Sequence, residues 1–339
     1  MNPATVAIVG GDTLLARELQ TVFSERAPDI PLLMTGFEQE EHGRYSGPPD
    51  EAEVVLAFDE SILAATGVAI LAGAMETSRK VHQFVSSKRR SPVLVDLTYA
   101  LEDEPGARLR APLAEPPKAS LEPSNVLVVA HPAAIVLASF FRRLHQRHPV
   151  RRWVVHVFEP ASERGKGGID ELQQQTVHLL SFRSLPKEIF DEQISFNLLP
   201  CYGAEAPHSL QSIEVRIERH LASLLARYGL IPIPSLRLVQ APVFHGHSFS
   251  VWVEFDQPPG AAELAATLAS ESIEVRAAGQ EPPTNVGVAG QSGMTVGLIE
   301  IDRNDPRCAW FWIVADNHRT SAENAVRLAQ TLLAGGARR

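Results

Sequence analysis

Residues 6–16 read VAIVGGDTLLA, and this stretch sets the fold of the first third of the chain. Val6–Val9 is an apolar run with the length of one buried strand, and Gly10 and Gly11 follow it at once. The next apolar residues recur at helical spacing, and they are Leu14, Leu15, Leu19, Val22 and Phe23. A buried strand that turns through glycines into an amphipathic helix predicts the first unit of a parallel sheet covered by helices.

Five further apolar runs extend this pattern toward residue 130. They are Leu32–Met34, Val54–Leu56, Val68–Leu71, Val93–Val95 and Val126–Val129. Helical stretches such as Ser78–Val85 lie between them. Because these runs carry almost no polar side chains, they are typical of parallel strands buried between two layers of helices. The sequence therefore predicts a Rossmann-type α/β domain over residues 1–132.

Beyond residue 133 the strands become longer and gain a polar face. Apolar Phe249, Val251, Val253 and Phe255 alternate with Ser248, Ser250, Trp252 and Glu254. The other elements expected here are helices over 134–144 and 169–180 and strands over 153–158, 295–301 and 309–314. This mixture predicts an α+β domain over residues 133–317. A last helix within 318–339 is expected to join the first domain.

The composition limits the kinds of partner. A formal net charge of -9 and a pI near 5.8 argue against binding to a nucleic-acid backbone, which requires clustered Lys and Arg. No run of 18 apolar residues and no secretory leader occur, so no membrane span is expected. Cys201 and Cys308 have no metal-type spacing and suit a reducing compartment. We therefore expect a cytoplasmic protein without a metal site.

Five strings spread over nearly the whole chain form a set. They are VAIVG at 6–10, GKGG at 165–168 with DEL at 170–172, ISFNLLP at 194–200, PVFHGHS at 242–248 and VADN at 314–317. In this order and at this spacing they resemble the aspartate-semialdehyde dehydrogenase family. DLTYAL at 96–101 and QAPV at 240–243 resemble the Usg-type branch of that family.

The resemblance implies a homodimer whose C-terminal domain makes the interface and whose N-terminal domain binds a dinucleotide. The family uses NADPH in amino-acid biosynthesis, reducing aspartyl phosphate to aspartate semialdehyde through a cysteine thioester. That reaction requires a thiolate nucleophile, a general base, a nicotinamide within hydride range and cationic groups for carboxylate and phosphate.

Two of the family's catalytic positions are changed and one is kept. The nucleophile position falls on Ala134, within HPAA at 131–134, and a methyl group cannot form a thioester. The general base is kept as His247, which is read either as catalytic or as structural. The glutamine after the first interface strand becomes Glu159. Cys201 is read either as a relocated nucleophile or as an ordinary packed thiol.

The substrate-binding positions are also altered. The carboxylate-binding arginine falls on Gln240, which cannot make a bidentate ion pair. The glutamate that holds the substrate amine falls on Ile213, or on Glu214 after a slip of one residue. Arg216 replaces the phosphate-binding lysine, and Glu102 replaces a second phosphate-binding arginine, which reverses the charge.

The dinucleotide loop keeps Gly10 and Gly11 but has Thr13 where the family has its middle glycine. Asp12 places a negative charge where a pyrophosphate would lie. After the second strand, Glu38 is suited to a ribose diol, which favours NAD over NADP. The resemblance thus implies NADP or NAD as the cofactor, while the loop residues argue against binding.

These substitutions lead to three hypotheses. The leading one is a paralogue without the parent activity, kept as a dimeric binding or partner protein that pairs with itself or with a dehydrogenase subunit. The alternative is an NAD(P)-linked oxidoreductase that uses His247 and Glu159 in non-covalent acid–base chemistry. The third is a sensor that binds a nucleotide or an amino acid without turnover.

Overall fold

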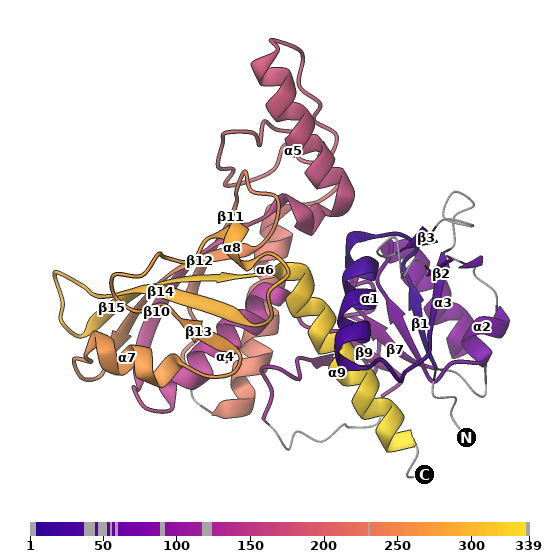
Figure 1. Cartoon of the computed structure of the whole chain (residues 1–339), viewed down its shortest axis with the longest axis horizontal. Helices are drawn as coiled ribbons and strands as arrows, with labels where there is room; N and C mark the ends of the chain where they lie inside the picture. The colour runs from indigo at the N-terminus through magenta and orange to yellow at the C-terminus, as the bar shows by residue number, and fades with distance from the viewer. Residues whose placement is uncertain are drawn as a thin grey trace. The chain divides into compact units, whose positions relative to one another are not determined.

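The structure is a computed structural model that describes residues 5–36, 45–46, 53–54, 56–57, 60–88, 92–116, 124–229 and 231–336 (Figure 1). The chain divides into two compact units. The first unit is formed by Met1–Ala130 and Ser321–Arg339, and the second by His131–Thr320. Each unit contains its own large sheet.

In the part of the chain that the structure describes, the sheet of the first unit has seven strands, and every pairing given for it is parallel. In spatial order they are β5 (Leu56–Ala57), β2 (Leu32–Gly36), β1 (Val6–Val9), β6 (Val68–Leu71), β7 (Val93–Asp96), β9 (Val126–Val129) and β8 (Arg108–Arg110). Helices α1 (Leu14–Arg26), α2 (Glu60–Ala64) and α3 (Met75–Ser86) lie between these strands along the chain. Strands β1, β6 and β9 are buried at every position, so the predicted parallel α/β architecture is confirmed.

Two details of the first unit differ from the prediction. The run Val54–Leu56 was expected to be one strand, but β4 (Glu53–Val54) pairs with β3 (Tyr45–Ser46) while β5 pairs with β2. Strand β8 was not predicted, because two arginines flank its single leucine. Arg110 is nevertheless buried there, since its guanidinium makes a two-pronged ion pair with the buried Glu115 at 2.6–3.0 Å.

The last helix, α9 (Asn317–Gly336), begins earlier than expected. From Ser321 onward it belongs to the first unit, where Ala322, Ala325, Val326 and Ala329 are fully buried. Glu323 pairs with Arg26 at 2.6 Å. The chain therefore completes its first core with its last helix.

Across its described residues, the second unit is built on a mixed sheet of six strands. In spatial order they are β11 (Ser235–Gln240), β10 (Val150–Glu159), β12 (His247–Phe255), β15 (Cys308–Ala315), β14 (Met294–Ile301) and β13 (Ile273–Val275). Helices α4 (Pro132–His145), α6 (Leu210–Leu225) and α7 (Ala261–Leu268) contact this sheet, and α8 (Asn285–Val288) contacts β15. The predicted α+β architecture is confirmed, and the expected alternation holds, since Phe249, Val251 and Val253 are all fully buried.

Helix α5 (Gly165–Leu180) stands away from the sheet of the second unit, followed by a long connection to α6 (Figure 1). Polar side chains of α5 hold this connection. Gln175 receives the backbone N–H groups of Ile194 and Ser195 and donates to two carbonyl groups, and Glu171 receives two more N–H groups. Gly168 is required for packing, because a Cβ there would lie 2.3 Å from the carbonyl oxygen of Ala161.

Candidate functional site

Three of the candidate site residues lie together at one end of the sheet in the second unit. Glu159 ends β10 and is in register with Gln240, which ends β11. Since Phe158 pairs with Ser248 in the antiparallel β10–β12 ladder, Glu159 and His247 occupy the next row. All three side chains point to the face that the helices cover, and each is at most 1% exposed.

Gln240 has its amide fully engaged within the unit. The Tyr202 hydroxyl donates to its Oε1 at 2.6 Å, and its Nε2 donates to the carbonyl groups of Glu159 and Ala241 at 2.8 and 3.1 Å. Gln240, which the resemblance predicts at the carboxylate-anchor position, thus ties three segments of the second unit together. The sequence indicated the position but not Tyr202, which lies on the connection after α5.

Glu159 is a buried carboxyl group that pairs with Arg164. Its Oε1 receives Nη2 of Arg164 at 3.0 Å, whereas its Oε2 is buried and has no hydrogen-bond partner. Burial raises the pKa of Glu159 to about 7, and the Arg164 guanidinium opposes that shift. The carboxyl group therefore exchanges its proton near neutral pH.

His247 is the first residue of β12, and its Nε2 is buried without a hydrogen-bond partner. Its ring centroid lies 5.7 Å from that of His131. Burial lowers the pKa of His247 to about 3, so the imidazole is neutral at physiological pH. Because a general base works best with a pKa near the working pH, this histidine is a weak base in the present arrangement.

Ala134 lies in the first turn of α4 and is fully buried. His131 caps this helix, since its Nδ1 accepts the N–H of Ala133 at 3.3 Å, and its Nε2 lies 3.7 Å from Glu163. Burial and then His247 lower the pKa of His131 well below its usual value. His131 was not among the predicted site residues, although His131 followed by Pro132 is a helix-start signal.

The buried side-chain amide of Asn317 links the segment after β10 to the turn before β12. Asn317 donates to Glu163 at 2.9 Å and accepts the N–H of Gly246 at 3.1 Å. It thereby holds the turn before β12 against the segment that follows β10. The ring of His245 lies 6.2 Å from that of His318 between centroids, so His245 and His247 have different neighbours.

Three candidate residues lie on α6, and their surroundings differ. Glu214 accepts the N–H of Leu238 at 2.6 Å and lies 3.6 Å from Arg237, so its carboxylate is bound to β11. Ile213 is buried in the core. Arg216 is half-buried, and its positive charge makes a minor contribution to the lowered pKa of His131, after burial and His247.

In the first unit, the glycine-rich turn is occupied by internal contacts. Thr13 caps α1 by accepting the N–H of Ala16 at 3.1 Å, and its hydroxyl donates to the carbonyl oxygen of Ala72 at 2.9 Å. Asp12 makes a two-pronged ion pair with Arg17 at 2.5–2.6 Å, which offsets its charge. Gly11 has a φ of +54°. Glu38 lies outside the described residues.

The two cysteines lie in different surroundings. Cys201 is exposed, unlike the buried cluster around His247. Cys308 is buried on β15, and burial followed by Asp305 raises the pKa of its thiol to about 11. Among the described residues, no group of three or more His, Cys, Asp or Glu side chains is arranged to hold a metal ion.

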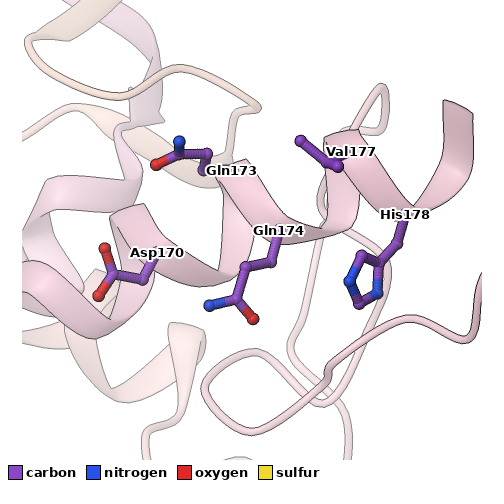
Figure 2. Close-up of a pocket in the computed structure, with 5 residues that line it drawn as sticks. All are labelled: Asp170, Gln173, Gln174, Val177 and His178. Carbon is purple, nitrogen blue, oxygen red and sulfur yellow. The ribbon is translucent and has the colours of Figure 1, made fainter. Parts of the chain in front are cut away.

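A separate shallow depression of about 240 Å³ lies along α5 (Figure 2). Its lining consists of Asp170, Gln173, Gln174, Val177 and His178. His178 is already bonded, since its Nδ1 lies 2.7 Å from the carbonyl oxygen of Ser184. The depression contains one apolar side chain and no converging charges, so we assign it no chemistry.

The parallel α/β unit and the mixed-sheet unit with its buried histidine together define a protein of the semialdehyde dehydrogenase class. The family model for the semialdehyde dehydrogenase dimerisation domain matches residues 141–320. The chain belongs to the aspartate-semialdehyde dehydrogenase family.

The chain is similar to relatives with two different names. A USG-1 protein homolog of Pseudomonas aeruginosa is 30% identical over 337 residues, which is 98% of each chain. An aspartate-semialdehyde dehydrogenase of Rickettsia bellii is 25% identical, over 97% of each chain. A solved structure of a probable aspartate-semialdehyde dehydrogenase from Pseudomonas aeruginosa has a TM-score of 0.84 at 30% identity and covers 98% of this chain and 99% of its own.

None of the helices within the described ranges has the length and apolar character needed to cross a bilayer.

Proposed function

We propose that this chain is a paralogue without the parent dehydrogenase activity, kept in the cytoplasm as a dimeric binding or partner protein. The observation that carries the proposal is Ala134 at the nucleophile position, buried in the first turn of α4 beside His131. A thioester requires a sulfur atom at that place. The exposed Cys201 and the buried Cys308 do not supply one there.

The substrate-binding positions support the same proposal. The side-chain amide of Gln240 is hydrogen-bonded to Tyr202 and to two backbone carbonyl groups, so it is not available to a substrate carboxylate. Glu214 is held by β11. Glu102 carries a negative charge where a phosphate would require a positive one.

The direct test is an assay of aspartate semialdehyde oxidation with phosphate and NADP or NAD. We expect no turnover by the natural chain or by Ala134→Cys, because the cysteine would still lack the arginine anchor. The double variant Ala134→Cys/Gln240→Arg restores both groups and is the variant in which activity would first appear. Turnover by the natural chain that is abolished by Cys201→Ser would contradict the proposal and identify a relocated nucleophile.

We propose a homodimer as the basic assembly, with a dehydrogenase subunit as the candidate hetero-partner. The match to the dimerisation-domain model over 141–320 supports the first part. Sedimentation of the protein alone, and then mixed with a working family dehydrogenase, distinguishes the two assemblies. If this chain is monomeric alone and forms a complex only when the dehydrogenase is present, the homodimer proposal is wrong and the hetero-complex takes its place.

One observation favours a second candidate function, an NAD(P)-linked oxidoreductase without a covalent step. Glu159 Oε2 and His247 Nε2 are both buried without partners, which leaves them available to a bound group. Gly10, Gly11 and Thr13 are the residues that would hold the cofactor, NADP or NAD. Calorimetric titration with NAD, NADH, NADP and NADPH tests this candidate, and the absence of heat with all four excludes it.

A further inference from the structure

Two buried polar atoms of the second unit belong to opposed residues and have no hydrogen-bond partner among the described residues. They are Oε2 of Glu159 and Nε2 of His247. Since Phe158 pairs with Ser248, Glu159 lies directly opposite His247 in the β10–β12 ladder, and both are buried under the helices. The Cβ atoms of such opposed residues are typically about 5 Å apart, so a group of a few atoms can reach both side chains.

The carboxylate oxygen Oε2 of Glu159 needs a donor that its neighbours give to other atoms. A polar atom buried without a partner opposes folding, so such an atom marks a place that a ligand or a water molecule fills. Nη2 of Arg164 donates to the other oxygen, Oε1, at 3.0 Å. The Tyr202 hydroxyl has one proton, which it donates to Gln240 at 2.6 Å. Oε2 is therefore left to accept from a bound group.

The charges next to these two side chains are mainly negative. Burial raises the pKa of Glu159, Arg164 opposes this shift and Glu163 adds to it, so the Glu163 carboxylate lies within electrostatic range. Burial lowers the pKa of His247, and the Asp316 carboxylate opposes that shift. The carboxyl groups of Glu159, Glu163 and Asp316 therefore outnumber the Arg164 guanidinium, which favours a cation over an anion at this place.

We infer that Glu159 and His247 form the binding place of a small primary ammonium group, which donates to Glu159 Oε2 and to His247 Nε2. An ammonium group has three N–H donors, and a neutral imidazole has one accepting nitrogen, so one ligand atom can satisfy both side chains. A carboxylate or phosphate oxygen has no proton to donate and would meet the Glu159 carboxylate with like charge. The ligand class is therefore a small amine without a carboxylate.

The inference rests on the binding role in the proposed function and names its ligand class. The resemblance implies an arginine at the position of Gln240 and a glutamine at the position of Glu159. The first change removes a positive charge and the second adds a negative one. Both changes alter the site in the direction that an amine requires and a substrate carboxylate does not.

Calorimetric titration of the full chain at pH 8 with three probes of similar size tests the ligand class. The probes are methylammonium, neutral formamide and formate. We expect methylammonium to bind at least ~10-fold more tightly than formamide, because its hydrogen bond to the carboxylate is charge-assisted, and we expect no heat with formate.

One substitution at the site and one outside it test the role of the carboxylate. Glu159→Gln keeps the shape of the side chain and removes its charge, so we expect methylammonium binding to weaken by at least ~10-fold. Glu188→Gln is the matched control, since Glu188 is exposed on the connection between α5 and α6. We expect it to leave the dissociation constant unchanged.

The pH dependence of binding tests the same group in the natural chain, so the test does not depend on the folding of a variant. Methylammonium, like a lysine side chain, stays charged from pH 6 to 8. Because the pKa of Glu159 is about 7, we expect methylammonium to bind about 10-fold more tightly at pH 8 than at pH 6. Binding at pH 7 should release roughly half a proton, which titrations in two buffers with different heats of ionisation measure.

Other titratable and charged groups face Glu159 from the elements packed around it. Burial lowers the pKa of His131 and His247, so both stay neutral from pH 6 to 8, and the expected pH dependence comes from Glu159. The neighbouring groups are Arg164 and Glu163 after β10, Tyr202 on the connection after α5, His247 on β12, Asp316 after β15, His131 before α4, and Arg216 and His220 on α6.

The outcomes are distinct. Formate binding that is lost in Arg164→Met overturns the inference and identifies an anion site. Equal affinities for formamide and methylammonium contradict the selection of a cation. No heat with any of the three probes overturns the inference and leaves the proposed loss of dehydrogenase activity standing. Aspartate semialdehyde turnover by a chain that also binds methylammonium through Glu159 would remove the proposed loss of activity and leave the ammonium site in place.

Discussion

Gln240 is a buried polar side chain whose hydrogen bonds join three segments of the second unit. We predict that Gln240→Ala lowers the free energy of unfolding of the second unit by about 2–4 kcal/mol. The truncation removes the acceptor of the buried Tyr202 hydroxyl and the donor to two carbonyl groups, and it leaves a cavity. Urea unfolding followed by tryptophan fluorescence measures this free energy of unfolding, because all four tryptophans lie in the second unit.

The matched control for this change is Gln173→Ala. Gln173 is exposed on α5, and a surface truncation of this kind is expected to change stability by less than ~0.5 kcal/mol. Equal effects of the two substitutions would mean that the Gln240 hydrogen bonds contribute nothing to stability.

At the level of single residues, the string PVFHGHS predicts His247 and HPAA predicts Ala134 as site positions, and both stay predictions. The structure brings Glu159, Gln240 and His247 together, but the sequence did not predict their partners. The pairing of Glu159 with Arg164 could not be predicted, because it depends on the turn that Ala161–Arg164 makes after β10. The contact of Tyr202 with Gln240 joins segments 38 residues apart and has no local signature.

Among the elements, the turn from β1 into α1 carries a prediction about Gly10. A Cβ at Gly10 would lie 2.9 Å from the backbone carbon of Ala72, so we predict that Gly10→Ala destabilises the first unit by about 3 kcal/mol. The first glycine of the turn is therefore required for packing, whether or not a dinucleotide binds. Far-UV circular dichroism is the measurement, since the tryptophans report only on the second unit.

Gly335→Ala in the same unit is the control for the glycine change. A Cβ at Gly335 meets nothing within 4 Å, and the residue is in the last turn of α9, where alanine is the better helix former. We expect it to be neutral or slightly stabilising. A Gly10→Ala protein as stable as the natural chain would show that Ala72 can move aside.

Helices and strands could be predicted from the sequence where the apolar periodicity extends over many residues. The buried strands of the first unit and the alternation in β12 follow directly from apolar periodicity. Helix α6 was missed although Ser209 caps it by accepting the N–H of Ser212, and apolar residues recur along it at helical spacing. Strand β13 has only three residues, too few for a periodic signal.

For the molecule as a whole, the buried histidines and Glu159 make opposite contributions to the pH dependence of stability. The pKa values of His131 and His247 are lowered in the native state. Below about pH 6.5 these two histidines therefore bind protons in the unfolded chain but stay neutral in the native state. Because the unfolded state binds more protons, the free energy of unfolding falls on acidification. Glu159 is the reverse case. Its native pKa of about 7 exceeds the unfolded value, so its stabilisation is present at low pH and is lost as pH rises toward 7.

We therefore predict that stability of the second unit rises from pH 5 to 6.5, because the buried histidines with lowered pKa values, His131, His247 and His318, outnumber Glu159. Glu159→Gln removes the opposing group and should steepen this slope by up to about 1.4 kcal/mol per pH unit. His247→Gln removes one of these histidines and should reduce the slope by up to about the same amount. Urea titrations followed by tryptophan fluorescence at pH 5, 6, 7 and 8 give the three slopes. If both substitutions change the slope in the same direction, the native state does not keep His247 neutral and Glu159 protonated over this range.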